Sequence, residues 1–204
     1  MIEGIDSPDL LRPWQDLKRY NVAPTQKMPA VRVKEGPEAA ELSWGIRPGW
    51  KKKTDRPLIN ARSETAATKP TFRESVARRR CLVPADGFYE WKREVKPAQP
   101  FYFHLKAEAP FWFAGIWEGD AYLILTTAPN ELLESIHDRM PVILDETTAA
   151  QWLGDRPLKE AVLKRLCSSY PARQMECREV SRKVNNARYD GPECIEGVDS
   201  TSPP

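Results

Sequence analysis

"CLVPADGFYEWK", residues 81–92, is the stretch that decides the fold, because it begins a run of successive strand-like segments. Three further segments rich in aromatic and β-branched residues follow it closely, which is typical of strands. They are residues 101–105, 111–117 and 121–127, and shorter strands are expected at residues 29–35, 40–46, 141–144 and 175–180. Helical patterns are inserted among the strands without regular alternation, at residues 70–80, 129–137, 146–153 and 157–167. This order predicts an α+β single domain with a mostly antiparallel, β-barrel-like core and flanking helices.

Three of the expected helices carry a start signal in the sequence. Thr71 and Glu74 have the spacing of a capping box at the start of residues 70–80. Asn130 is a residue type that caps helices, and Pro157 after Asp155 is expected to open the last helix.

Glu90 is the one acid inside the aromatic run of Phe88, Tyr89 and Trp91. Side chains on a strand point alternately to opposite faces, so Glu90 can face water while Tyr89 and Trp91 face the core. The alternative is that Glu90 has a functional role, which requires other polar groups to converge on it.

Composition excludes several classes of protein. The chain has 204 residues, of which 41% are hydrophobic and 29% charged, and this is globular rather than disordered composition. No apolar run approaches the roughly 18 residues of a membrane helix, and the first residues do not resemble a signal peptide. The four cysteines match no zinc or redox spacing and the chain has only two histidines, so we expect reduced thiols, a cytoplasmic protein and no metal site.

Positive charge is concentrated in one third of the chain. From Arg47 to Arg80 there are eleven Lys or Arg and three acids, a local charge of +8, although the whole chain carries only +2. Such a run is often a solvated surface. Trp44 and Trp50 bracket Arg47 just before three lysines, however, and single-strand binding sites combine cations with aromatic platforms. Nucleic acid is therefore a candidate partner.

Polar residues at the ends of predicted elements supply candidate chemistry. Asn60 and Arg62 follow an apolar pair, His137 and Arg139 lie between a helix and a strand, and Asn21 precedes a proline-closed turn. A histidine, a glutamate and an asparagine suffice for proton transfer and carbonyl stabilisation. Without further support, the default interpretation of His137 is a capping or surface histidine. His104, at one position of an alternating strand, is expected to be structural.

Six stretches, in this order, resemble the SRAP family (SOS-response-associated peptidases), the abasic-site processing proteins. They are "RYNVAPTQ", "SWGIRPGW", "INARSETAATKPTFR", "RRCLVPADGFYEWKR", "SIHDRMPVIL" and "VSRKVNNARYDGPECIE". The resemblance runs from about Arg19 to Glu196, so residues 1–196 are expected to form an SRAP-like domain and residues 197–204 a disordered tail. It implies a single α+β domain with a basic cleft for single-stranded DNA, and a chemistry of side chains and a chain terminus that needs no cofactor. Nothing in the sequence suggests more than a monomer.

The resemblance also implies a chemistry and a set of site residues. A cysteine exposed by removal of the initiator methionine would form a Schiff base with an abasic-site aldehyde and then close a stable thiazolidine. Asn60 would orient the terminal residue and the sugar, Glu90 would move protons during Schiff-base formation, and His137 would serve ring opening and reversal. Further residues are implied in DNA binding, namely Arg62 as a phosphate clamp and Trp44, Arg47, Asn21 and Arg139 along the cleft.

The beginning of this sequence departs from the family pattern, which is Met-Cys-Gly-Arg followed by an aromatic residue. Here Met1 is followed by Ile2, Glu3 and Gly4, and the usual first strand is absent. Two explanations are open: the start is misassigned and an upstream stretch carries the cysteine, or the chain is a noncovalent, catalytically inactive DNA binder. An α-amine alone could still form a reversible Schiff base. A third alternative is a hydrolase in which Glu90 and His137 activate water.

Overall fold

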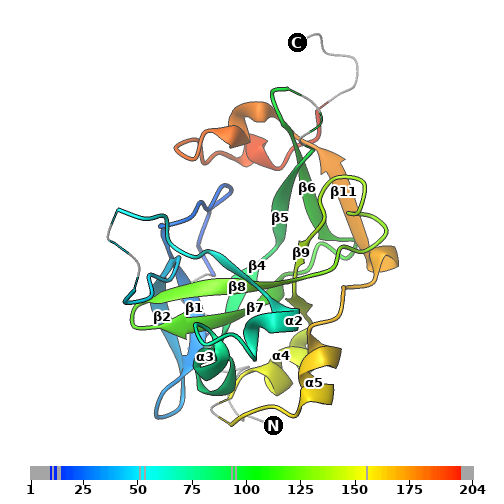
Figure 1. Cartoon of the computed structure of the whole chain (residues 1–204). Coiled ribbons are helices and arrows are strands. Elements are labelled where there is room, and N and C mark those ends of the chain that lie inside the picture. Colours follow the sequence, from blue (N-terminus) through cyan, green and yellow to red (C-terminus); the bar gives the residue numbers. More distant parts are fainter. Residues whose placement is uncertain are drawn as a thin grey trace.

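A computed structural model describes residues 10, 12, 15–50, 52, 54–92, 94, 96–154 and 156–198 (Figure 1). The expectations for the first four residues, for Lys51, Lys53 and Asp155, and for most of the carboxy-terminal tail lie outside the described residues.

Five strands form a closed ring in the order β7–β4–β1–β2–β8, with β8 pairing back onto β7. Their bounds are Lys27–Val33 (β1), Pro37–Trp44 (β2), Arg80–Ala85 (β4), Phe111–Glu118 (β7) and Ala121–Thr127 (β8). Only β2 and β8 pair in parallel within the ring. Three short strands add to its edges, namely β3 (Asn60–Arg62) and β9 (Met140–Pro141) on β8, and β10 (Ile143–Leu144) on β7. The α+β fold with a mostly antiparallel, barrel-like core is confirmed.

Both faces of ring strands β4, β7 and β8 are largely buried, which is why these three strands are continuous apolar runs rather than alternating ones. In β4, Leu82 belongs to one hydrophobic cluster and Val83 to another, and in β8, Leu123 and Ile124 divide in the same way. Neighbouring residues of a strand point to opposite faces. One face therefore packs against the helices, and the other faces a second sheet.

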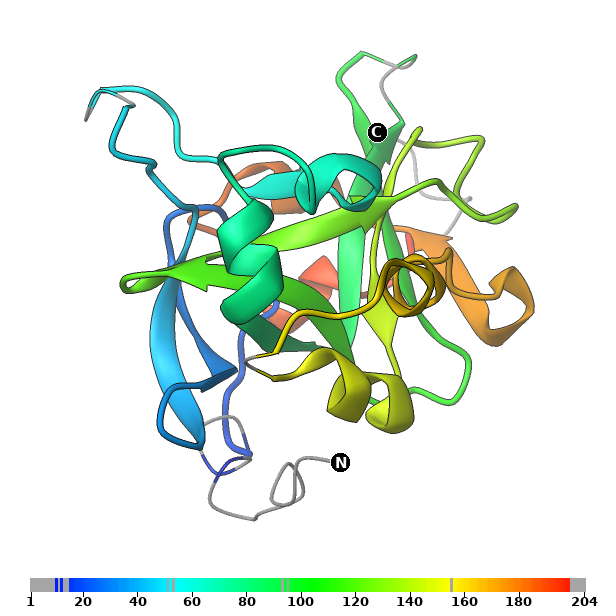
Figure 2. The same cartoon turned by 60° about the horizontal axis from the view of Figure 1, so that its bottom comes forward.

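Four short α-helices are present in the described residues, and Figure 2 shows α3, α4 and α5 on one side of the ring. They are α2 (Ser63–Ala66), α3 (Arg73–Arg78), α4 (Glu146–Trp152) and α5 (Glu160–Leu166). The helices expected within residues 70–80, 146–153 and 157–167 are confirmed, with shorter bounds. The carboxylate of Asp145 accepts the Thr148 N–H at 2.8 Å and caps α4.

Three details of the predicted helices are wrong. Phe72, not Thr71, precedes α3, and no side chain caps that helix, so the capping box is absent. Pro157 lies before α5, which begins only at Glu160. Residues 131–136 form turns instead of a helix, although Asn130 Oδ1 still accepts the Leu133 N–H at 3.2 Å.

The expected strand at residues 81–92 is in fact two strands in different sheets. At Asp86 the chain leaves the ring and continues as β5 (Gly87–Lys92) in a three-stranded antiparallel sheet of order β11–β6–β5. The other two strands are β6 (Gln99–Leu105) and β11 (Met175–Glu179). Three 3-10 helices lie in the same part of the sequence. η2 (Ala172–Gln174) precedes β11, and η3 (Arg182–Asn185) and η4 (Pro192–Cys194) follow it. In the part of the chain that the structure describes, no helix is long and apolar enough to span a membrane.

Candidate functional site

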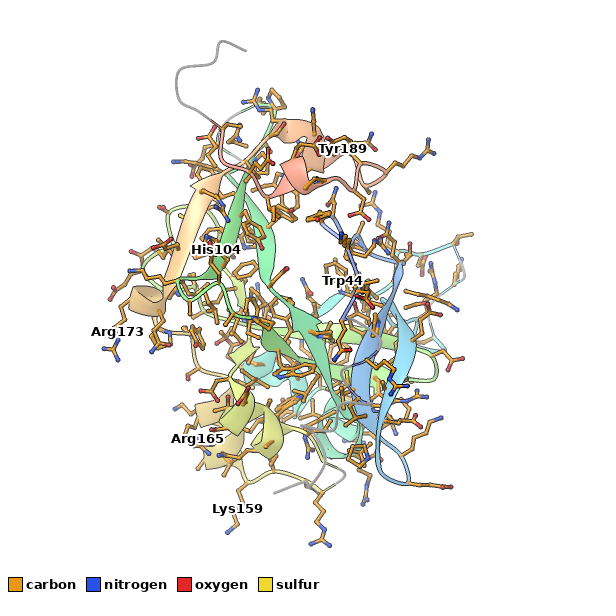
Figure 3. The ribbon with its side chains drawn as sticks, turned by 180° about the vertical axis from the view of Figure 1, so that it is seen from behind. Trp44, His104, Lys159, Arg165, Arg173 and Tyr189 are labelled. Atoms are coloured by element: carbon orange, nitrogen blue, oxygen red, sulfur yellow. The ribbon has the colours of Figure 1, made fainter. Side chains whose placement is uncertain are left out.

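A cleft of about 710 Å³ lies between the ring and the small sheet. One wall is the face of the ring that is turned towards the small sheet, with Val83, Phe113 and Tyr122 among its apolar side chains. The other walls are residues 17–24, which precede β1, the strand β5, and the segment of residues 181–190, called here the C-terminal segment. Figure 3 shows this arrangement: Trp44 lies on the ring side, and Tyr189 belongs to the C-terminal segment above it.

Glu90 lines this cleft from the middle of β5. Alternation places it on the strand face of Phe88, which stacks on Phe103 with ring centroids 5.2 Å apart. Tyr89 and Trp91, on the opposite face, pack against the cluster that contains Tyr102 and Val184. The alternation expected for Glu90 is therefore present, but its carboxylate faces the cleft, where its side chain retains 21% of its accessible surface.

His137 lines the same cleft from the turn that precedes β9. Its Nδ1 lies 3.8 Å from Glu90 Oε2, although Glu90 belongs to the small sheet and His137 to the connection between β8 and β9. The Arg139 backbone N–H donates to Nδ1 at 3.1 Å. The Arg139 carbonyl oxygen lies at the same 3.1 Å from Nδ1, so the two contacts hold the ring in place without assigning its tautomer. The imidazole is thus held in one orientation beside a carboxylate.

Asn60 and Arg62 belong to the same face of β3, two residues apart. Asn60 is exposed and lines the cleft, whereas Arg62 is exposed about 7 Å further along the strand and is not part of the lining. The short strand itself was not expected from sequence; it forms because Asn60, Ala61 and Arg62 pair in parallel with β8. Arg62 is therefore placed at the rim rather than inside the cleft.

Trp44 and Arg47, the other predicted residues on the ring side, differ in position. Trp44 ends β2, lines the cleft, and is oriented by an indole N–H bond to the Ile59 carbonyl at 3.0 Å. Arg47 is exposed, donates to the Asp55 carbonyl, and lies outside the lining. Trp50 is 69% exposed, also outside the lining.

Asn21 and Arg139 have contacts that give them structural roles. Asn21 contributes to the lining but is only 5% exposed, and its amide nitrogen lies 2.9–3.2 Å from the carbonyl oxygens of Val184, Asn186 and Tyr189. Arg139 donates two bonds of 2.8 Å to the carboxylate of Glu64 and one to the Thr126 carbonyl. This pairing lowers the pKa of Glu64. Arg139 does not line the cleft.

A set of contacts that the sequence did not reveal joins Asp190 to residues 19–21, which line the cleft, and is called here the latch. Asp190 accepts hydrogen bonds from the Tyr20 and Asn21 backbone N–H groups at 2.6 and 2.7 Å and from the guanidinium of Arg19 at 2.5 Å. Burial alone would raise the pKa of Asp190, but these three donors together lower it. Asp190 lies within one of the six stretches that resemble the family, "VSRKVNNARYDGPECIE". Its hydrogen-bond partner Tyr20 is 170 residues away in the chain, however, so no local sequence pattern predicts the bond.

None of the four cysteines, all of which lie in described parts of the chain, lines the cleft. Cys81, Cys167 and Cys194 are buried, and burial raises the pKa of Cys167 to about 12. No internal thiol is thus placed to act as a nucleophile there. Within the described residues, no group of three or more His, Cys, Asp or Glu could hold a metal ion.

The cleft therefore combines an imidazole, a carboxylate and a carboxamide over an apolar floor. The first two can move protons at a carbonyl carbon, and the third can orient a polar group. Such an arrangement suits reactions of an aldehyde or an amide in a largely pre-formed pocket.

Comparisons with known proteins agree with this architecture. Residues 10–187 match the family model of the SOS response associated peptidases (SRAP). The chain is 41% identical over 191 residues to the abasic site processing protein YoqW of Bacillus subtilis, covering 87% of this chain and 85% of that one. It is 36% identical to YedK of Escherichia coli, also named an abasic site processing protein, covering 90% and 86%.

A crystal structure of a Bacteroides thetaiotaomicron protein superimposes with a TM-score of 0.72 at 26% identity, covering 85% of this chain and 82% of that one. The match of the family model to most of the chain, together with these relatives, shows that this protein belongs to the SOS response associated peptidase (SRAP) family.

Proposed function

We propose that this protein processes abasic sites in single-stranded DNA, with the lesion bound in the cleft beside Asn60, Glu90 and His137. The observation that carries the proposal is the approach of His137 Nδ1 to Glu90 Oε2, 3.8 Å apart, in a cleft that Asn60 also lines. Residues from β3, β5 and the turn before β9 thus line the same cleft. The names of the relatives YoqW and YedK supply the substrate class.

The chemistry that fits this site is Schiff-base formation at the ring-opened aldehyde. An α-amine adds its nitrogen lone pair to the aldehyde carbon, the carbonyl oxygen takes up two protons in turn and leaves as water, and the nitrogen gives up two protons to leave the neutral imine. Glu90 and His137 are proposed to carry these protons, with His137 also opening the sugar ring and serving reversal. Asn60 is proposed to orient the sugar and the terminal residue.

The durable crosslink requires a thiol beside that amine. In a chain whose first residue is cysteine, the thiol adds across the C=N bond, its proton passes to nitrogen, and a thiazolidine closes without net oxidation. The sequence given has Ile2 after Met1. We therefore assign the crosslink, and the peptidase step that removes the methionine, to a form that presents a cysteine. Arg62 and Trp44 are proposed to hold the phosphate backbone and a base.

Noncovalent binding of single-stranded DNA is the second candidate function. One observation favours it: none of the four cysteines lines the cleft, so the chain as given has no thiol at the site.

The test mixes a labelled single-stranded oligonucleotide carrying one abasic site with this chain, and separately with a version extended to begin Met-Cys-Gly-Arg. We expect only the extended form to give a DNA-linked band that survives denaturation. His137→Gln and Glu90→Gln in the extended form should slow its formation by on the order of 10²-fold while retaining DNA affinity. Glu118→Gln, an exposed acid at the end of β7, serves as the matched control.

Three outcomes decide between the readings. A denaturation-resistant band from the unextended chain would mean that a nucleophile other than a terminal cysteine operates. DNA binding without any band from either form would favour the noncovalent binder. Unchanged rates in both cleft variants would remove Glu90 and His137 from the proposed chemistry.

A further inference from the structure

The C-terminal segment, residues 181–190, is a wall of the cleft to which the proposed chemistry gives no role. Its residues Val184, Asn185 and Ala187 line the cleft directly. Figure 1 shows this orange-to-red part of the chain at the top of the molecule, with ring strands β1 and β2 below it. A ligand that fills the cleft therefore contacts this segment.

Three cations flank those lining residues in the sequence: Arg182, Lys183 and Arg188. All three are exposed. Arg182 donates to the neutral Gln99 Oε1 at 3.0 Å, and the Lys183 ammonium lies 5.3 Å from the centroid of the Tyr189 ring. Within the described residues, none of the three forms an ion pair with a carboxylate, in contrast to Arg19, Arg32 and Arg139.

The acids of the same region are already engaged. Asp190 binds the guanidinium of Arg19 and two backbone N–H groups. Glu193, in η4, accepts the hydroxyl of Tyr189, which contributes to lowering its pKa. The charge of Asp190 is offset by Arg19, whereas that of Glu193 offsets part of the charge of Lys183, so the remaining positive charge of the C-terminal segment lies mainly on Arg182 and Arg188.

The backbone beneath these cations is held in place from the other end of the chain. The amide of Asn21 reaches the carbonyls of Val184, Asn186 and Tyr189, and the Arg188 N–H donates to Asn186 Oδ1 at 3.1 Å. A pinned backbone with solvent-exposed cationic side chains reduces the entropy lost when an anion binds.

We propose that Arg182, Lys183 and Arg188 form a phosphate-binding rim on the C-terminal segment, so that a DNA strand is held by its backbone on both this wall and the ring wall. The inference rests on the proposed function, because it takes single-stranded DNA as the ligand of the cleft. It adds a second set of backbone contacts to the Arg62 side. These contacts position the strand without reading its sequence.

The test is the salt dependence of DNA affinity. Fluorescence anisotropy with a labelled oligo-dT strand lacking any lesion is measured between 50 and 200 mM salt. Each phosphate contact to a single strand contributes a slope of about −0.7 in log K against log salt. The triple variant Arg182→Gln/Lys183→Gln/Arg188→Gln should therefore bind more weakly with a slope shallower by roughly 2. The ratio of the DNA affinity of the unmodified protein to that of the triple variant should fall by roughly an order of magnitude between 50 and 200 mM salt.

The chain offers a control with the same charge change. Lys159, Lys164 and Arg165 are exposed, and Arg165 donates to Gln151 as Arg182 does to Gln99. Figure 3 shows Lys159 and Arg165 at the end of the molecule opposite Tyr189. Lys159→Gln/Lys164→Gln/Arg165→Gln should leave the slope close to that of the unmodified protein.

The double variant Lys183→Gln/Arg188→Gln keeps the Arg182–Gln99 bond, so it controls for a loss of folding caused by breaking that bond. Its slope should still be shallower than that of the unmodified protein by about 1.4. If the two triple variants give the same slope, the rim is excluded, whereas the proposed function stands as long as the unmodified protein binds. If the unmodified protein does not bind the strand at all, the proposed function fails and the rim fails with it.

Discussion

Single residues in this protein acquire their roles from what faces them across the cleft. In sequence, Glu90 is the polar member of an alternating strand, and that description is correct for β5. The carboxylate nevertheless points at His137, which comes from a turn after β8. A local pattern defines the face of a strand, but not whether that face meets water or a histidine.

Gly87 lies so close to the ring of Tyr102 that there is no room for a side chain at position 87. A Cβ added there would lie 2.2 Å from Cζ and 2.3 Å from the hydroxyl oxygen of Tyr102, a buried residue that also lines the cleft. Gly87→Ala should therefore destabilise the fold by roughly 1–3 kcal/mol, as overpacking does, and weaken DNA binding by displacing Tyr102. Thermal unfolding and anisotropy measure the two effects.

Gly36→Ala is the matched control, because nothing lies within 4 Å of a Cβ at that position. Equal stability of the two alanine variants would show that Tyr102 moves aside without cost.

At the scale of elements, a buried arginine joins the ring to its helical layer. Arg80, at the start of β4, donates to the carbonyls of Val76 and Ala77 at 2.8 Å, of Trp152 at 2.5 Å and of Arg156 at 2.8 Å. These carbonyls lie towards the ends of α3 and α4 and just beyond α4. Helix ends leave such carbonyls without partners inside the helix, so one guanidinium satisfies groups from three segments.

Arg80→Lys keeps the charge but loses the planar fork that reaches these carbonyls. We expect it to lower the free energy of unfolding by roughly 2–4 kcal/mol, since buried acceptors are left without donors. Urea denaturation measures this loss. Arg78→Lys, whose side chain is 63% exposed, should change stability by less than about 0.5 kcal/mol. A similar small loss for both variants would contradict the role given to Arg80.

At the scale of the whole molecule, the latch of Asp190 joins residues before the ring to residues after the small sheet. Asp190→Asn removes the charge that holds Arg19 and the two backbone N–H groups. It should lower the free energy of unfolding near pH 7 by roughly 1–3 kcal/mol, because hydrogen bonds to charged groups are lost. Chemical denaturation at a series of pH values measures the effect.

The pH dependence follows from the lowered pKa of Asp190. A carboxyl group with a lowered folded-state pKa contributes stability above its unfolded pKa, about 3.9, and loses that contribution as the pH falls through the folded value. The difference in the free energy of unfolding between Asp190→Asn and the unmodified protein should thus be constant from pH 5 to 8 and become smaller in stronger acid. Glu196→Gln, an exposed acid, should show no such difference. A gap that widens in acid would contradict the latch.

The sequence by itself determined the fold class, most strands, three helices and the family. Continuous apolar runs such as residues 111–117 and 121–127 carry their strand signal locally, and six ordered stretches carry the resemblance. Only the tertiary structure decided that residues 81–92 divide between two sheets at Asp86, and that residues 60–62 form a strand. Only it decided that Arg139 pairs with Glu64, Asn21 with the C-terminal segment, and Asp190 with Arg19. The physical reason is sequence separation: a strand pattern repeats every two residues, whereas a hydrogen bond between residues 21 and 190 has no local signature and exists only once the ring has closed.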